Sequence, residues 1–229
     1  MRVAVSWSGG KDCCYAYYKA LLEGFEVVCL INMVSSTGRV TAHGLDPKLI
    51  AAQSKALGIP LIQRETSWDG YEEDFKKVLV ELKNKLEIKG VVFGDINVQE
   101  HLDWVNKVCS EVGLEAIEPL WGLSEEEVLK GFVGAGFDAI VVKAKTEIFG
   151  EEWVGRRVDG NFIKDLMELR KFKDFDLCGE RGEYHTFVID GPTFKMRIKI
   201  LEAKRVLREG YWRNWILEIT SYELEDKTS

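Results

Sequence analysis

The 229-residue sequence contains no run of 18 apolar residues and no Cys-x-x-Cys pair. We therefore expect neither a membrane-spanning helix nor a zinc or redox site of the paired-cysteine kind. The three histidines, His43, His101 and His185, are far apart in sequence, which gives no basis for a metal cluster built on them. An odd number of cysteines without a spacing pattern indicates free thiols in a reducing compartment; the five are Cys13, Cys14, Cys29, Cys109 and Cys178.

Positive charge is also in short supply, with 31 Lys and Arg residues against 38 Asp and Glu residues and a net charge of -7. A general nucleic-acid-binding protein would be basic, so nucleic acid is an unexpected partner. The apolar stretch before Gly9 is too short for a secretory signal, and we expect a cytoplasmic protein. The sequence leaves a homo-oligomer open.

The first half of the chain alternates apolar strands with amphipathic helices, a pattern typical of a parallel sheet covered by helices on both faces. Strands are predicted at residues 3–7, 26–33, 59–62, 90–94 and 114–117. Helices are predicted at residues 11–23, 46–57, 69–86 and 98–112. Asp46 is a plausible N-cap for the second helix, with Pro47 at its first position and Gly58 after its end.

The second half of the chain does not show this regular alternation of strands and helices. A capping box from Ser124 to Glu127 predicts a helix to about Val133. A strand at 137–142, a loop-like segment at 143–161 and a helix at 162–169 are expected next. From Thr186 the chain reads as β structure, including strands at 194–200 and 212–222 and a frayed tail from Glu225. We therefore predict an α/β domain at 1–117 and a smaller α+β domain at 118–229.

The segment Ser8–Asp12, with the sequence Ser-Gly-Gly-Lys-Asp, follows the first strand and opens the first helix. Its two glycines permit close backbone approach to an anion, and the helix N-terminus attracts negative charge. Ser8 adds a hydroxyl donor and Lys11 a positive charge. Asp12 would repel a bare phosphate, but it fits a Mg²⁺ ion that bridges to phosphates. A Walker A loop is excluded, because Val5 and Asp12 stand where Gly and Ser or Thr are required.

Other candidate residues lie at predicted strand ends, where parallel sheets place their ligands. Asp95, preceded by Gly94, is a candidate for a second metal or nucleotide contact, although a helix N-cap or turn role also fits it. Ser6 belongs to the strand end that enters the glycine turn. His43 follows the second strand and either reaches a nucleotide or makes a loop hydrogen bond.

A second motif, rich in glycine and in charged and polar residues, lies at Gly179–Thr186. Its sequence is Gly-Glu-Arg-Gly-Glu-Tyr-His-Thr, and it leads into a predicted strand. Glu183 and His185 are two residues apart, so in a strand they would share a face. Such a pair can act as acid, base or hydrogen-bond reader of a substrate. The alternative is a polar, charged hairpin with a satisfied histidine.

The Ser8–Asp12 segment resembles the PP-loop of the N-type ATP pyrophosphatases, which split the bond between the α- and β-phosphates of ATP. The resemblance implies a HUP or Rossmann-like PP-loop fold for the first domain. Over almost its whole length the chain is similar to the diphthine–ammonia ligase family. The motifs that carry this likeness lie at residues 8–12, 42–44, 93–96, 119–121, 153–156, 179–186 and 190–192.

This resemblance implies that the carboxylate of diphthine, a modified histidine on translation elongation factor 2, attacks the α-phosphate of ATP. An acyl-adenylate would form, and ammonium would supply the nitrogen, since no glutaminase Cys-His motif is present. The expected nucleotide-binding residues are Ser6, Ser8, Gly9, Gly10, Lys11, Asp12, His43, Gly94 and Asp95, with Asp12 and Asp95 as Mg²⁺ ligands. The expected acceptor-binding residues are Glu180, Glu183, Tyr184, His185 and Thr186. The expected catalytic residues are Lys11, Asp12, Glu183 and His185.

Two other functions fit the motifs less well. Another PP-loop adenylating enzyme, such as a tRNA-modifying ligase, would share the loop, but a tRNA thiolase would usually need paired cysteines. A nucleotide-binding regulator without turnover would need neither Asp12 nor the carboxylates of residues 180–183. Detection of AMP and pyrophosphate as products would separate these alternatives.

Overall fold

A computed structural model describes residues 1–35, 38, 44–209 and 213–227 of the chain. The chain divides into two compact units. The first contains Met1–Ser8 and Asp12–Gly122, and the second contains Gly9–Lys11 and Leu123–Ser229. The domain boundary expected near residue 118 stays a prediction. His43 and the segment 210–212, on which parts of the sequence interpretation fell, lie outside the described residues.

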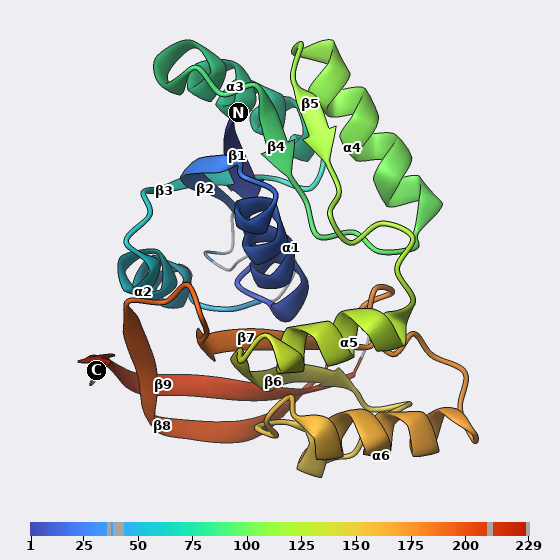
Figure 1. The fold of residues 1–229 in the computed structure, drawn as a ribbon. Helices are drawn as coiled ribbons and strands as arrows, with labels where there is room; N and C mark the ends of the chain where they lie inside the picture. Colours follow the sequence, from blue (N-terminus) through green and yellow to red (C-terminus); the bar gives the residue numbers. More distant parts are fainter. Residues whose placement is uncertain (36–37, 39–43, 210–212, 228–229) are drawn as a thin grey trace. The chain divides into compact units, whose positions relative to one another are not determined.

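The first unit contains a five-stranded parallel sheet with the strand order β3-β2-β1-β4-β5 (Figure 1). Each neighbouring pair is parallel, which confirms the α/β fold class expected from the alternation of strands and helices. The bounds are β1 Arg2–Ser6, β2 Glu26–Ser35, β3 Leu61–Thr66, β4 Gly90–Val92 and β5 Glu115–Ile117. The strand order reverses between β1 and β4, so the switch point lies at the ends of these two strands.

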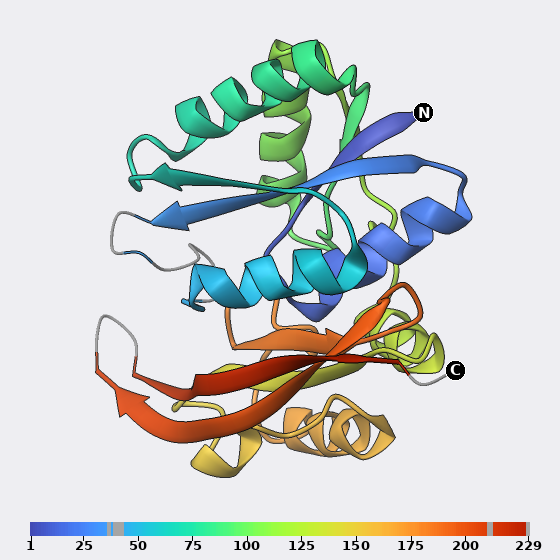
Figure 2. The ribbon, with the colours of Figure 1, turned by 90° about the vertical axis from the view of Figure 1, so that its left-hand side faces the viewer.

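Four helices cover the two faces of this sheet. They are α1 Lys11–Leu22, α2 Pro47–Leu57, α3 Tyr71–Leu86 and α4 Gln99–Glu111. The helices α3 and α4 lie on one face, and α1 and α2 lie on the other (Figure 2). The buried stripe of α3 consists of Phe75, Val78, Leu79 and Leu82, which its helical spacing predicts. No helix among the described residues is both long and apolar enough to span a bilayer.

The helix α2 shows how local sequence fixes an element. The side chain of Asp46 accepts a hydrogen bond from the backbone N–H of Lys48 at 2.9 Å, and Pro47 occupies the first helical turn. Gly58 ends the helix in the left-handed conformation, with φ of 71°. A cap of the Asp46 kind stabilises a helix by about 1 kcal/mol, so these bounds are set locally, as the sequence predicted.

The second unit contains a four-stranded antiparallel sheet with the order β7-β6-β9-β8. Its strands are β6 Asp138–Lys145, β7 Tyr184–Asp190, β8 Met196–Arg208 and β9 Asn214–Asp226. Its helices are α5 Glu125–Gly134, a single 3₁₀ turn η1 Glu151–Trp153, and α6 Gly160–Arg170. The capping box of α5 is present in full, with the Ser124 and Glu127 side chains each bonded to the other's backbone N–H. This unit has the expected α+β character.

Aromatic side chains form much of the core of the second unit. Phe162 of α6 makes edge contacts with Trp153 and with Tyr184 of β7, each pair of ring centroids being 5.6 Å apart. Phe149 contacts the same Tyr184 ring at 5.8 Å. Tyr184 is thereby held on several sides, and aromatic contacts of this geometry add stability beyond that of burial alone.

Two expectations about the second unit were wrong. The segment at 143–161 is not all loop, because β6 continues to Lys145, where it pairs with β9, and η1 follows. The tail is not frayed from Glu225, since β9 reaches Asp226 and Glu225 lies opposite Arg197 of β8. Both errors concern strand ends that consist largely of charged residues. The backbones of these residues form hydrogen bonds with strands distant in sequence, and the local pattern of apolar side chains does not predict such pairing.

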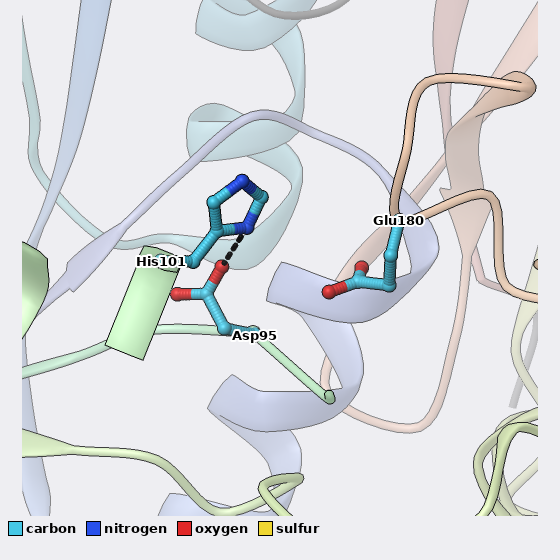
Figure 3. A group of neighbouring side chains, drawn as sticks. All are labelled: Asp95, His101 and Glu180. Carbon is cyan, nitrogen blue, oxygen red and sulfur yellow. Dashed lines mark hydrogen bonds and ion pairs between the residues drawn. The ribbon is translucent and has the colours of Figure 1, made fainter. Parts of the chain in front are cut away.

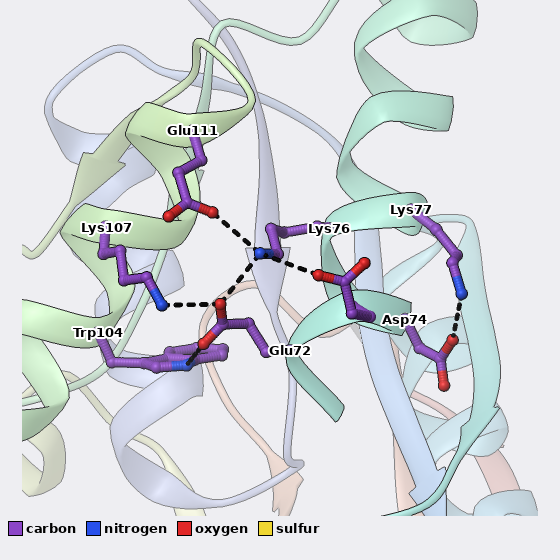
Figure 4. A network of polar contacts seen from close by, with 8 residues as sticks. Glu72, Asp74, Lys76, Lys77, Trp104, Lys107 and Glu111 are labelled. Carbon is purple, nitrogen blue, oxygen red and sulfur yellow. Dashed lines mark hydrogen bonds and ion pairs between the residues drawn. The ribbon is translucent and has the colours of Figure 1, made fainter. Parts of the chain in front are cut away.

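A network of ion pairs joins α3 to α4 (Figure 4). The Glu72 carboxylate accepts hydrogen bonds from Lys76 at 3.0 Å, Lys107 at 2.8 Å and the indole N–H of Trp104 at 3.1 Å. Lys76 also contacts Glu111 at 2.9 Å. The hydrogen bonds from the two lysines lower the pKa of Glu72 to about 2.

We expect Glu72→Gln to flatten the acid-induced loss of stability. The ordinary pKa of this carboxyl is 4.5, so its stabilising effect is complete above that pH and is lost as the pH falls to about 2. The variant should therefore unfold at a lower temperature than wild type at pH 7, and the difference should vanish near pH 2. Added salt should shrink it as well.

Thermal unfolding followed by circular dichroism at several pH values measures this effect, with Glu23→Gln at an exposed position as the matched control. Equal pH dependence of the wild type and the Glu72→Gln protein would show that the network adds nothing to stability.

Candidate functional site

The end of β1 is held by a buried polar network. The backbone N–H of Trp7 donates to the Ile31 carbonyl at 2.7 Å, and the Asn32 side chain donates to the Trp7 carbonyl at 2.8 Å. The Trp7 indole donates to Gln53 of α2 at 2.9 Å, and Gln63 of β3 donates to Asn32 at 3.1 Å. Since buried polar groups with satisfied hydrogen bonds specify one arrangement, the strand enters the following turn from a fixed position.

The turn itself begins at Ser8 and Gly9. Gly9 has φ of 84°, a left-handed conformation that favours glycine. Its carbonyl accepts a hydrogen bond from the backbone N–H of Val188 in β7 at 3.0 Å, a contact within the second unit, to which Gly9 belongs. The Ser8 hydroxyl lies 3.4 Å from the sulfur of Cys13. The turn thus combines a left-handed glycine with the start of a helix, two features that anion-binding loops commonly have.

Lys11 is the first residue of α1, and its side chain is almost completely buried, with 2% exposure. Within the second unit, its backbone N–H donates to the Thr186 hydroxyl at 2.9 Å. Its ammonium donates to the Cys178 carbonyl and lies 5.1 Å from the centre of the Tyr184 ring. A carbonyl oxygen and an aromatic face are both favourable neighbours for an ammonium group.

Gly94, just after β4, lies directly against the start of α1. A Cβ atom at this position would stand 2.8 Å from the carbonyl carbon of Asp12 and 2.9 Å from the backbone nitrogen of Cys13. These are backbone atoms that cannot move aside independently. Only glycine therefore allows the chain after β4 to approach Asp12 this closely, and the neighbouring Asp95 is brought to the same strand-end edge of the sheet.

Asp95 is hydrogen-bonded to His101 of α4, with 3.1 Å between Oδ1 and Nδ1 (Figure 3). This hydrogen bond raises the pKa of His101 above its ordinary value, against the opposing effect of partial burial. Glu118, which follows β5, has both carboxylate oxygens buried. Burial, with a smaller contribution from the charge of Asp95, raises the pKa of Glu118 to about 8. At neutral pH the buried Glu118 carboxyl therefore favours its protonated form.

In the second unit, buried carboxylates shape the loop that precedes β7. Glu183 accepts hydrogen bonds from the backbone N–H of Asp176 at 3.1 Å and of Arg181 at 3.0 Å, and is only 5% exposed. Asp176 in turn accepts from the backbone N–H of Cys178 at 2.8 Å. The Tyr184 hydroxyl donates to the Leu177 carbonyl at 2.7 Å. The loop is folded around these groups, so Glu183 stabilises the loop conformation and is also a candidate site residue.

Models of two consecutive domains match the chain. The diphthamide synthase N-terminal domain matches residues 1–116, and the diphthamide synthase C-terminal domain matches residues 124–222. The chain belongs to the diphthamide synthase family.

Relatives in this family include rat and human proteins named diphthine–ammonia ligase, which are 30% and 28% identical to this chain. Each alignment covers all of this chain and 94% of the relative. A solved structure from Methanocaldococcus jannaschii, titled a predicted subunit of tRNA methyltransferase, aligns with 84% of this chain and 98% of its own. Its sequence identity is 17% and its TM-score 0.46, a likeness too weak to inform the fold or the function.

The structure places the predicted residues of this diphthamide synthase family member in two groups. In the first unit, Ser6 ends β1, Ser8 follows it, and Asp12, Gly94 and Asp95 lie at the strand-end edge. In the second unit, Gly9, Gly10 and Lys11 group with the loop and strand that carry Glu180, Glu183, Tyr184, His185 and Thr186. The contribution of His43 is outside the described residues.

The sequence analysis missed several residues of this candidate site. Asn32 and Gln53 are buried polar residues that fix the entry to the turn, and no local motif marks them. Glu118 could have been found, because it follows β5 just as Asp95 follows β4, and the strand-end rule applies equally to both.

Proposed function

We propose that this protein is a diphthine–ammonia ligase, which uses ATP to convert the carboxylate of diphthine into an amide with nitrogen from ammonium. The observation that carries the proposal is the setting of Lys11. Lys11 is a buried lysine at the start of a glycine-rich strand-to-helix turn, and its backbone N–H donates to Thr186 of the Gly179–Thr186 motif. Its ammonium donates to Cys178, just before the motif, and lies over the Tyr184 ring. The proposed phosphate-binding turn and the family-specific motif therefore meet at one residue. The two matching domain models support the same activity.

ATP is proposed to bind at the switch point between β1 and β4, with its terminal phosphates on the Ser8–Asp12 turn. The loop amides, the Ser8 hydroxyl and the Lys11 ammonium would offset the charge that develops on the leaving pyrophosphate. Ser6 and Gly94 line the two strand ends, and His43 keeps its predicted nucleotide role. Preorganised donors of this kind need no rearrangement when the α–β bond breaks, which is why they accelerate the step.

The carboxylates of the first unit fit a Mg²⁺ ion, which prefers oxygen ligands. Asp12 and Asp95 are the proposed ligands, because the close approach of Gly94 to Asp12 brings these two acidic residues to one edge of the sheet. When bound there, Mg²⁺ would neutralise phosphate charge. The hydrogen bond from His101 holds the Asp95 carboxylate in place at Oδ1.

The proposed acceptor is diphthine on translation elongation factor 2. Its carboxylate would attack the α-phosphate of ATP, forming an acyl-adenylate and releasing pyrophosphate. Ammonia would then attack the acyl carbon, and AMP would leave. Dividing the amidation into two displacements makes each one easier.

Residues of the second motif divide into two roles in this proposal. Tyr184 and Thr186 contact Lys11 and so position the phosphate-binding turn. Glu183 holds the loop in shape through two backbone N–H groups, while Glu180 and His185 act on the acceptor side. Lys11 and Asp12 are the proposed catalytic residues of the turn and His185 is that of the second motif, whereas Glu183, which the sequence predicted to be catalytic, is proposed to act by holding the loop.

The decisive experiment incubates the protein with ATP, Mg²⁺, ammonium and elongation factor 2 that carries diphthine. We expect AMP and pyrophosphate from ATP, and conversion of the carboxyl to an amide, seen as a mass decrease of about one dalton in the modified peptide. Production of ADP and phosphate would contradict the PP-loop assignment. AMP formation that depends on a tRNA instead of the diphthine protein would identify a different adenylating enzyme, and ATP binding without turnover would identify a regulator.

A further inference from the structure

The strand β6 carries two lysines that face the Gly179–Thr186 motif and that the sequence interpretation did not assign. In the antiparallel ladder, Val141 lies opposite Thr186, whereas Lys143 lies opposite His185. The register shift between Val141 and Lys143 is a bulge, so these two residues pair with neighbours on opposite faces of β7. The bulge thus turns Lys143 onto the face of His185, and bulges commonly redirect side chains in this way next to functional sites.

Lys145 follows on the same face of β6. Its backbone N–H donates to the Glu183 carbonyl at 2.8 Å, and its ammonium donates to the Arg181 carbonyl at 2.9 Å. Lys145 is therefore anchored to the loop between Gly179 and Tyr184. In both of these contacts the accepting group is a backbone carbonyl.

Lys143 is partly buried, and no carboxylate among the described residues pairs with it. Burial, and to a lesser extent the positive charge of Lys145, lowers the pKa of its ammonium. Partial burial of an ammonium group without a counter-ion is unfavourable, since the group loses hydration without gaining a partner. A side chain kept in this state is suited to receive an anionic ligand.

The space beside this cluster is left open by Gly182. This residue has φ of 77°, and a Cβ built on it would stand 3.9 Å from the Lys145 ammonium and 4.0 Å from Nε2 of His185. A side chain at position 182 would project between the two nitrogen donors. Glycine at this position therefore serves both the backbone conformation and access to the cluster.

We propose that Lys143, Lys145 and His185 form the binding site for the carboxylate of the acceptor before its adenylation. This inference rests on the proposed function, which supplies a carboxylate as the nucleophile. The cluster provides two lysines of β6 and an imidazole of β7 on one face of this strand pair, a donor set that suits an oxyanion. Lys143 and Lys145 hold the carboxylate in place for attack, and His185 supplies a hydrogen bond to it.

The nucleotide is a second source of oxyanions, and the position of Lys11 separates the two. Lys11 contacts Tyr184 and Thr186 of β7. Lys143 instead lies opposite His185, the residue between them in the same strand. Alternate residues of a strand point to opposite faces. The lysine of the phosphate-binding turn and the β6 lysines therefore serve different groups, and we assign the β6 lysines to the acceptor.

Steady-state kinetics with Lys143→Met tests the assignment. Loss of one charge-assisted contact should raise the KM for the diphthine protein on the order of 10–100-fold, while the KM for ATP stays near the wild-type value. Lys143→Arg should restore most of the affinity for the acceptor because it keeps the charge. Lys195→Met, at an exposed lysine of the same unit, is the matched control and should leave both constants unchanged. An unchanged KM for the acceptor, or an equal rise for ATP, would overturn the proposal.

A binding readout keeps this inference separate from the proposed function. Acetylation of Lys143 by acetic anhydride, followed by mass spectrometry, should be slowed by elongation factor 2 that carries diphthine. It should not be slowed by the same factor with an unmodified histidine, or by ATP alone. Protection without amide formation would disprove the proposed function and retain the carboxylate site. Amide formation without protection of Lys143 would retain the function and reject the site.

Discussion

Replacing Lys11 by alanine is expected to lower the turnover of ATP-dependent amidation on the order of 10²–10³-fold, the effect typical of losing one preorganised donor at a site of developing charge. Lys11 stands at the start of α1 and is buried, so water cannot substitute for its ammonium effectively. Because the charge on the leaving pyrophosphate grows in the transition state, the loss should fall mainly on kcat.

Rapid-quench measurement of AMP formation gives this rate, and circular dichroism establishes that the variant is folded. Lys55→Ala, at an exposed position in the last turn of α2, is the matched control and should retain the wild-type rate. A folded Lys11→Ala protein with wild-type turnover would place the nucleotide phosphates elsewhere in the molecule.

Gly94→Ala is the second change for which a large effect is expected. The added methyl group would stand 2.8 Å from the Asp12 carbonyl carbon and 2.9 Å from the Cys13 nitrogen, so either the chain after β4 or the start of α1 must shift. Overpacking of this kind typically costs about 1–3 kcal/mol of stability. A displacement of about 1 Å at reacting groups can reduce turnover about 10²-fold, and we expect a loss of that size.

Denaturant unfolding and turnover should be measured on the same preparation. The control is Gly134→Ala, since a Cβ at the end of α5 meets no atom within 4 Å and should leave both quantities near wild type. If Gly94→Ala kept full activity, the close approach of this segment to Asp12 would have no bearing on the site.

The regular elements of the first unit could be read from local sequence, because their signals are local. The Asp46 cap, Pro47 and Gly58 set the bounds of α2, and the spacing of Phe75, Val78, Leu79 and Leu82 predicts the buried face of α3. The second unit was harder. The continuation of β6 to Lys145 and of β9 to Asp226 depends on pairing between strands far apart in sequence. The charged residues at these strand ends give no apolar pattern from which the pairing could be predicted.

The candidate site divides in the same way. The Ser8–Asp12 turn and the Gly179–Thr186 loop were singled out from the sequence, since glycines and polar residues clustered at a strand end are typical of binding sites. Lys143 and Lys145 were not, because a bulge in the β6–β7 ladder decides which face they occupy. A one-residue shift of register moves a side chain to the other face of a sheet, and periodicity alone cannot detect it.

The sequence by itself determined the fold class, the position of the candidate phosphate-binding turn and the family likeness, because these depend on residue types at short spacing. Only the tertiary structure decided what these residues touch. It showed that Lys11 is bonded to Thr186 and Cys178, and that Glu183 braces its own loop. It also showed that Gly94 is required by the backbone of Asp12. Such contacts join residues up to 175 positions apart, and they arise from packing of whole elements, which no local pattern encodes.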